Sequence, residues 1–192
     1  MKILFKRNSY ALYLLFSFSC SFPFASKSLG APIPATSSSF VISGHMGSFI
    51  SEHGFSIHAD ETDWKQSPAP QDNPFIEILY RAPTTHYGVQ AGLTLRVDQL
   101  EKAQSLKSYV LRWLKDYPRF GFKILDSKPL KVNDQKAFLL DMVNRQTSKQ
   151  IRQVVFLKDK TAAILTCRDH HQSFSKTVST CNKIISHFHW TQ

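Results

Sequence analysis

The sequence lacks three features that would each indicate a function. Its apolar run at residues 10–18 (YALYLLFSF) has nine residues, whereas a membrane-spanning helix needs about 20. It has no glycine-rich loop of the kind that cradles phosphates. The stretch GFSIH at residues 54–58 lacks the second glycine of the nucleophile elbow of serine hydrolases. We therefore expect no spanning helix in the processed protein, no phosphate loop and no serine-hydrolase site.

Acidic residues are few, and none lies near the N-terminus. The chain has 24 basic and 14 acidic residues and a formal net charge of +10. Lys2, Lys6, Arg7 and Lys27 lie in a leader without acidic residues, and without these four the charge is 20 minus 14, or +6. Basic and aromatic residues interleave over residues 112–123, but at helical spacing the aromatic side chains would point inward. We therefore expect no binding of nucleic acid.

The leader predicts export. A short positive segment at residues 1–7 precedes the nine-residue apolar run, which is the pattern of a signal peptide. We assign residues 1–30 to the signal peptide, with cleavage between about residue 20 and residue 32. A lipid anchor at Cys20 is the alternative, although Ser17 and Phe18 depart from the usual lipoprotein pattern. The predicted location is the periplasm or the exterior of the cell.

The rest of the chain is predicted to form one domain. Residues 26–39 (SKSLGAPIPATSSS) are rich in Ser, Ala and Pro and have no periodicity. We assign residues 31–48 to a flexible N-terminal arm and residues 49–192 to a single domain, because 192 residues with 42% hydrophobic content suit one core.

Strands dominate the predicted domain. Alternating or continuous apolar runs predict strands at residues 54–59, 75–80, 86–97, 122–132, 137–143, 152–157 and 161–167. Residues 81–85, 133–134 and 158–160 are predicted turns or short connections. Residues 64–73 are predicted to be a loop, in which Trp64 folds back as a lid over the core.

Two helices are predicted to cover the sheet. Apolar residues keep helical spacing at residues 106–117, with Ser105 as the N-cap and Pro118 and Gly121 as stop signals. A second helix follows residue 172, where Phe174, Cys181 and Phe188 lie on one stripe. The runs at residues 154–157 and 162–165 are apolar at every position, so both faces of these strands should be covered. The predicted class is α+β, a curved antiparallel sheet of about six strands covered by helices on both faces (an α/β/α sandwich).

The order of these elements resembles that of the PsbP-like superfamily. The resemblance covers about residues 50–190 and includes the phrases RWLKDYPRFGF, RQVVFL and LTC followed by CNKIISHFHW. This superfamily includes the lumenal accessory protein of photosystem II, the nuclear release factor for the Ran GTPase and many small exported bacterial proteins. The resemblance implies a curved antiparallel sheet between helices, without a shared active site.

Two of the three cysteines, Cys167 and Cys181, are predicted to form a disulfide. They are separated by thirteen residues, and an exported protein folds in an oxidising compartment. Because Cys181 lies well inside the last predicted helix, a loop containing His170 and His171 has to let that helix start beyond the strand end. If it does not, both cysteines are buried thiols.

A sharper hypothesis makes Cys167 a nucleophile with His170 or His171 as its base. It requires a free thiol, so the disulfide prediction opposes it. Pairs of histidines at 170–171 and 187/189 suggest a metal, but no carboxylate or cysteine stands at matching spacing. We therefore predict no metal and no cofactor.

The function predicted from these features is a non-enzymatic exported protein that binds a partner or assists assembly in the cell envelope. The predicted partner is an envelope protein or an anionic envelope polymer, because the body of the chain is moderately basic. Trp64, His170 and His171 are the predicted contact surface. The alternative is a small envelope hydrolase or thiol enzyme that uses Cys167 with His170 or His171.

Overall fold

The computed structural model describes residues 48–71 and 73–191, which belong to the compact unit Ser38–Gln192. The predicted signal peptide, Cys20 and nearly all of the predicted arm lie outside the described residues. The elements are β1 (Ser48–Ser51), β2 (Phe55–His58), β3 (Lys65–Ser67), β4 (Ile76–His86), β5 (Val89–Gln99), α1 (Leu106–Leu114), the 3-10 turn η1 (Tyr117–Phe120), β6 (Lys123–Val132), β7 (Gln135–Asn144), β8 (Lys149–Lys158), β9 (Thr161–His170), α2 (Phe174–Ser186) and β10 (His189–Trp190).

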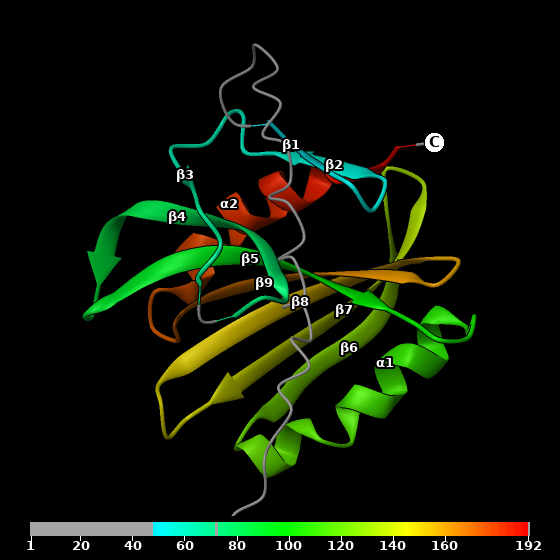
Figure 1. Cartoon of the computed structure of the whole chain (residues 1–192). Coiled ribbons are helices and arrows are strands. Elements are labelled where there is room, and N and C mark those ends of the chain that lie inside the picture. Colours follow the sequence, from blue (N-terminus) through cyan, green and yellow to red (C-terminus); the bar gives the residue numbers. More distant parts are fainter. Residues whose placement is uncertain (1–47, 72, 192) are drawn as a thin grey trace, which may run out of the picture. The chain divides into compact units, whose positions relative to one another are not determined.

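The described strands form two antiparallel sheets (Figure 1). The larger has seven strands in the order β3-β4-β5-β9-β8-β7-β6, and the smaller has three in the order β1-β2-β10. Strands β6 to β9 follow one another as a meander, which includes the three strands predicted at residues 137–143, 152–157 and 161–167, whereas β5 pairs with β9 across a long stretch of chain. The middle of the large sheet is therefore formed by two neighbouring strands, β5 and β9, that are distant in sequence.

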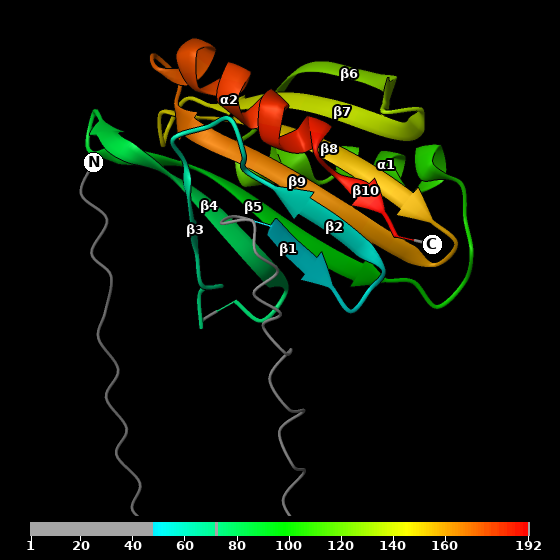
Figure 2. The same cartoon turned by 90° about the horizontal axis from the view of Figure 1, so that it is seen from above.

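Both faces of the central strands are buried, by different elements. On β8, Val154 and Phe156 belong to one apolar cluster and Val155 to another, as expected when side chains alternate across a strand. The first cluster contains the inward residues of α2 and of the small sheet, and the second those of α1. We call the two sides of the large sheet the α2 face and the α1 face (Figure 2).

Helical cover is thinner than the predicted α/β/α sandwich requires. The contacts of α1 with the sheet concentrate on β7 and β8, and those of α2 on β8 and β9. On the α2 face the small sheet supplies the remaining cover through residues such as Phe55 and Ile57. The antiparallel α+β architecture is as predicted, but one helix per face covers only the middle of the sheet.

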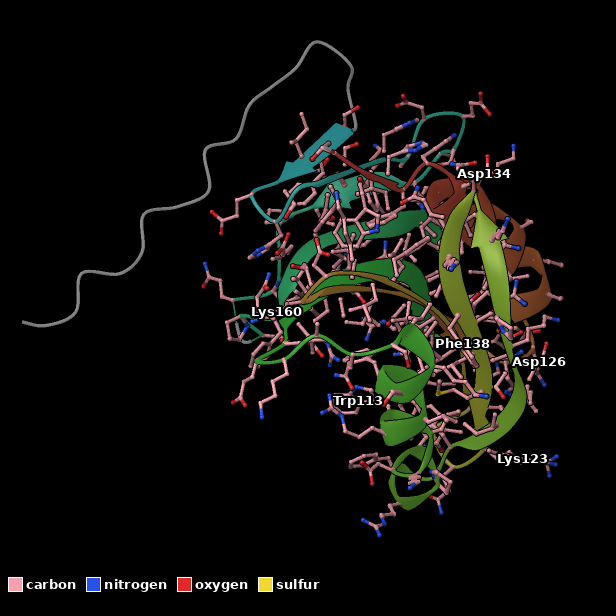
Figure 3. All side chains as sticks on the ribbon, turned by 90° about the vertical axis from the view of Figure 1, so that its right-hand side faces the viewer. Trp113, Lys123, Asp126, Asp134, Phe138 and Lys160 are labelled. Atoms are coloured by element: carbon pink, nitrogen blue, oxygen red, sulfur yellow. A yellow bond between two sulfur atoms is a disulfide. The ribbon has the colours of Figure 1, made fainter. Side chains whose placement is uncertain are left out.

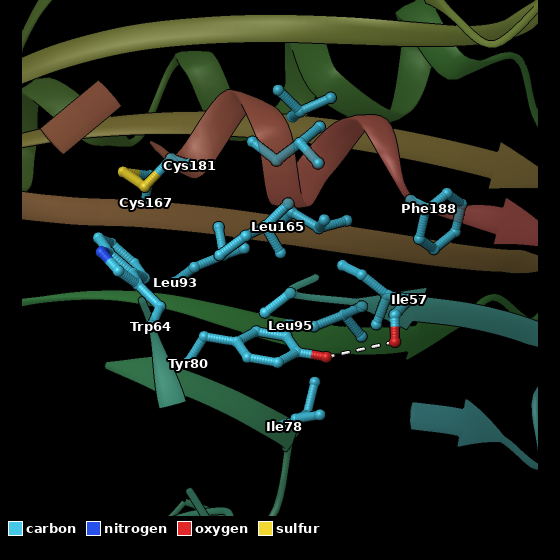
Figure 4. Packing of buried hydrophobic residues seen from close by; sticks show 14 of the residues in the cluster. Ile57, Trp64, Ile78, Tyr80, Leu93, Leu95, Leu165, Cys167, Cys181 and Phe188 are labelled. Atoms are coloured by element: carbon cyan, nitrogen blue, oxygen red, sulfur yellow. Dashed lines mark hydrogen bonds between the residues drawn. A yellow bond between two sulfur atoms is a disulfide. The ribbon is translucent and has the colours of Figure 1, made fainter. Parts of the chain in front are cut away.

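Aromatic packing joins the C-terminus to the α2 face. Phe188, just after α2, stacks on Phe156 of β8 with ring centroids 4.2 Å apart and lies 5.4 Å from Phe55 of β2. Tyr80 of β4 donates its hydroxyl proton to the Ile57 carbonyl at 3.3 Å (Figure 4). Aromatic packing and a buried hydrogen bond thus help to attach the small sheet to the large one.

The first predicted helix is shorter than its apolar stripe. Ser105 is the N-cap, as predicted, and its side chain accepts a hydrogen bond from the Ser108 backbone N–H at 3.1 Å. The α-helix ends at Leu114, and Tyr117 belongs to η1. Gly121, with φ +80°, ends η1 in the left-handed conformation that glycine adopts without strain. Pro118 therefore lies in the first turn of η1, which extends the helical stripe, and Gly121 ends it.

The described strands differ from the prediction in several places. Residues 81–85, predicted as a connection, continue β4, and the chain turns at Tyr87 and Gly88. β3 lies within the predicted loop 64–73, and β10 follows the last helix. β3 and β10 are short and form only because β4 and β2 offer them a partner, so local periodicity carries no signal for them. The turn at Asn133 and Asp134 is as predicted, with positive φ at both residues.

Candidate functional site: the rim at the end of the central strands

Cys167 and Cys181 are joined in a disulfide, with their Cα atoms 6.0 Å apart. Cys167 lies three residues before the end of β9, about 10 Å along a strand. Cys181 lies seven residues after the start of α2, about 10 Å along a helix. Because the chain reverses between the two elements, these equal distances bring the cysteines face to face. The helix does start beyond the strand end, although His170 is still a strand residue and only residues 171–173 form the connection.

The disulfide removes the thiol that the nucleophile hypothesis requires. Both cysteines are fully buried in the α2-face core, and both sulfur atoms are bonded to each other (Figure 4). His170 contacts Tyr87 and His171 through its ring and accepts a hydrogen bond from the Gln172 N–H. In this structure neither histidine has a thiolate to activate, so the alternative of a thiol enzyme has no support.

Asp169 anchors the reversal between β9 and α2. This buried carboxylate accepts hydrogen bonds from the Ser173 hydroxyl at 2.8 Å, from the Thr177 hydroxyl and from the His170 N–H at 2.6 Å. Its position at the first turn of α2 suits the positive end of the helix dipole. Asp169 thereby fixes the direction in which His170 and His171 leave the sheet.

His170 and His171 lie on an exposed rim at this end of the sheet. The Tyr87 ring, at the tip of the β4–β5 hairpin, stacks on His170 with centroids 4.6 Å apart, and His171 follows at 4.7 Å. Beyond His171 is a hollow of about 460 Å³, whose lining also contains Leu125 and Arg145. We define the rim surface as the residues Tyr87, Leu125, Arg145, His170 and His171.

Trp64 is not part of this surface. It is 8% exposed and belongs to the α2-face core that also contains Cys167 and Cys181 (Figure 4). The predicted role of Trp64 as a lid over the core is thus close to its position, but its side chain is too buried to contact a partner. Tyr87, which the sequence interpretation did not single out, takes its place as the exposed aromatic residue.

A second polar cluster joins Ser51, His53 and Glu77 near β1 and β4. The Ser51 hydroxyl donates to Glu77 at 2.7 Å, and His53 Nε2 lies 3.0 Å from the other oxygen of the same carboxylate. Burial raises the pKa of Glu77, partly offset by the Ser51 hydrogen bond. In a catalytic triad the histidine stands between the serine and the acid. Here the acid stands between the other two, so the cluster ties β1 to β4 and does not form a triad.

Two histidines stack where α2 ends beside β2. The rings of His58 and His187 are 3.9 Å apart and almost parallel, and His58 Nδ1 lies 3.1 Å from Asp60. Burial lowers the pKa of His58 below its ordinary 6.5, and the neighbouring charge of His187 acts in the same direction.

Within residues 48–71 and 73–191, no group of three or more potential ligands is arranged to hold a metal ion. No helix in the same residues is long and apolar enough to cross a membrane.

The disulfide should stabilise the domain without taking part in a reaction. In the chain-entropy model, a loop of this length contributes about 3 kcal/mol, so the double substitution Cys167→Ala and Cys181→Ala should lower the free energy of unfolding by about that amount. Urea unfolding of the oxidised parent, the reduced parent and the double variant measures this difference in the free energy of unfolding. Free thiol reacting rapidly at Cys167 in the untreated native protein would contradict this account.

The lowered pKa of His58 predicts a loss of stability in mild acid. Below about pH 6.5 the unfolded chain takes up a proton that folded His58 resists, so the free energy of unfolding falls as the pH decreases. His58→Gln should reduce this fall between pH 7 and pH 5, as measured by urea unfolding at a series of pH values. His86→Gln, at an exposed histidine, is the matched control and should keep the slope of the parent. Equal slopes for the parent and His58→Gln would refute the prediction.

Comparison with known proteins gives similarity at the level of fold. No protein-family model and no curated protein matches the sequence. Among solved structures, the cyanobacterial PsbP of Synechocystis sp. PCC 6803 superposes with a TM-score of 0.55 at 11% identity, covering 82% of this chain and 99% of that one. LpqN, involved in cell envelope biogenesis of Mycobacterium tuberculosis, gives 0.56 at 12% identity, with 72% and 83% covered. A protein of Bacteroides thetaiotaomicron gives 0.51 at 14% identity, with 77% and 50% covered. Together with the antiparallel sheet and its two helices, these similarities show that the chain has a PsbP-like fold.

Proposed function

We propose that this protein is an exported, non-enzymatic protein of the cell envelope that binds an acidic partner through the rim surface. The disulfide supports a place in an oxidising compartment, as does the signal-peptide pattern of residues 1–30.

The observation that carries the proposal is the conformation of Tyr87. This residue occupies the left-handed region with φ +53° at a hairpin tip, and its side chain is 66% exposed. Asn, Asp or Gly fills such a position with less strain than a bulky aromatic residue. Because Tyr87 is so exposed, it adds little to the core, and its stacking on His170 holds the ring upright. A strained residue that adds little to the stability of the fold is typical of residues that contact a ligand or a partner.

The charge of the rim indicates the nature of the partner. Arg145 is exposed, and none of the five rim residues is acidic. The nearby Asp169 is buried and is satisfied by α2 hydroxyls. Tyrosine and arginine are the residue types that protein interfaces favour at their energetic centres. An acidic segment of an envelope protein fits this combination of ring stacking and positive charge.

The structural neighbours are compatible with this role. LpqN is described as involved in cell envelope biogenesis, and the cyanobacterial PsbP shares the same fold. Identities of 11% and 12% transfer a fold and no residue role, so the argument for binding depends on the rim itself.

Site-specific photocrosslinking in the producing cell tests the proposal. A benzophenone amino acid in place of Tyr87 should give a discrete adduct in the envelope fraction, and Arg145→Glu in the same chain should abolish it. The control places the same group at Phe75, which is 63% exposed and lies at the other end of β4. Equal adducts from both positions, or none from position 87, would refute the rim as a binding surface.

A further inference from the structure

A groove runs along the α1 face between the start of α1 and the β6–β7 hairpin. Its volume is about 1010 Å³, at the upper end of the range for small-molecule sites. Figure 3 views the molecule from this side, with Phe138 labelled on the sheet and Trp113 on the helix. The apolar lining residues are Ala103, Leu106, Pro129, Phe138 and Leu157, together with Leu130 and Ala137, which belong to the α2-face cluster and lie where the groove reaches the end of the hairpin. The rim surface lies at the other end of β7, so the two surfaces are separate.

Three lysines from both walls of this groove line it without a close ion pair. Lys131 of β6 and Lys136 of β7 are directly opposite each other in the sheet and therefore point to the same face. Lys107 of α1 lines the groove as well. In the described part of the chain, no carboxylate oxygen lies within 4.0 Å of any of these three ammonium groups, although Asp159 is also in the lining.

The opposed pair of lysines is unfavourable in the absence of an anion. Like charges directly across an antiparallel pair destabilise the pair, and because both side chains are exposed, water and salt weaken this repulsion without removing it. By contrast, Lys128 on the opposite face of β6 is 2.7 Å from Asp126. The chain thus neutralises a lysine on one face of β6 and leaves two unneutralised on the face with the groove.

The composition of the groove distinguishes between classes of ligand. A peptide that buried its backbone there would need hydrogen-bonding partners, and the floor is made of apolar side chains. Addition of a peptide strand to the free edge of β6 is opposed by Pro129, by the exposed lysines of that strand and by the irregular register between Ile124 and Asp126. An alkyl chain needs no hydrogen bonds and fits an apolar floor.

We propose that the groove binds an anionic amphiphile, a lipid whose alkyl chain lies on the floor at Phe138 and Leu157 and whose acidic head group lies between Lys131 and Lys136. The apolar floor stabilises the chain by removing it from water, and the paired ammonium groups stabilise the head group through charge-assisted hydrogen bonds. This binding is independent of the partner proposed for the rim surface.

Titration with dodecyl phosphate below its micelle concentration tests the proposal, with the purified mature protein and calorimetric detection. One molecule should bind per chain, whereas inorganic phosphate and the neutral dodecyl maltoside should each bind at least about tenfold more weakly. The double variant Lys131→Gln and Lys136→Gln should lose at least about tenfold in affinity. Ala103→Trp should also weaken binding, because the indole would fill the groove from an exposed loop position without removing a core residue.

The matched control removes the same charge from the other face. Lys123→Gln with Lys128→Gln alters two exposed lysines of β6 whose register partners lie on the α2 face, and it should leave the affinity unchanged. Thermal unfolding of each variant checks that the fold is kept. Failure of dodecyl phosphate to bind, equal loss in both double variants, or tight binding only of an acidic peptide with apolar residues would each overturn the proposal. None of these results would affect crosslinking at Tyr87.

Discussion

The structure depends on the burial of both faces of β8 and β9. Residues 154–156 and 162–165 are buried at every position, so each of these strands needs apolar cover on two sides. The chain supplies this cover with α1, from the middle of the domain, on one face and with α2 and the small sheet, from its two ends, on the other. Because the strands separate the two clusters, we expect that each face can be stabilised or altered with little effect on the other.

The two faces are built differently. The α2 face is closed by the disulfide, by the aromatic layer around Phe156 and Phe188, and by the small sheet that β10 completes. The α1 face is covered by a helix of nine residues, which leaves a groove beside it. Binding surfaces are therefore expected where the cover ends, at the rim beyond β9 and in the groove beside α1, and the disulfide in between serves stability.

The sequence predicted the elements that local pattern determines. The meander from residue 137, the turn at Asn133 and Asp134 and the helix after Ser105 all follow from periodicity and turn chemistry. The disulfide followed from compartment and spacing. The short strands β3 and β10 and the burial of Trp64 depend on partners distant in sequence, and no local pattern encodes them.

The binding surfaces were harder to predict for the same reason. His170 and His171 were identified because they are adjacent histidines, but Tyr87 joins them only through the pairing of β5 with β9. Lys131 and Lys136 are ordinary surface lysines in the sequence, and the hairpin register alone places them opposite each other. Spacing along the chain identifies residue types that suit a site, whereas sheet register decides which of them meet.

Hydrogen exchange of the oxidised and the reduced protein tests most directly whether the two faces are independent. Reduction of Cys167–Cys181 should increase amide exchange in α2 and in the strands β2 and β10 that pack against it. Exchange in α1 and in the β6–β7 hairpin should stay unchanged. Equal acceleration in α1 would contradict the central claim, because it would mean that the two cores open as one unit.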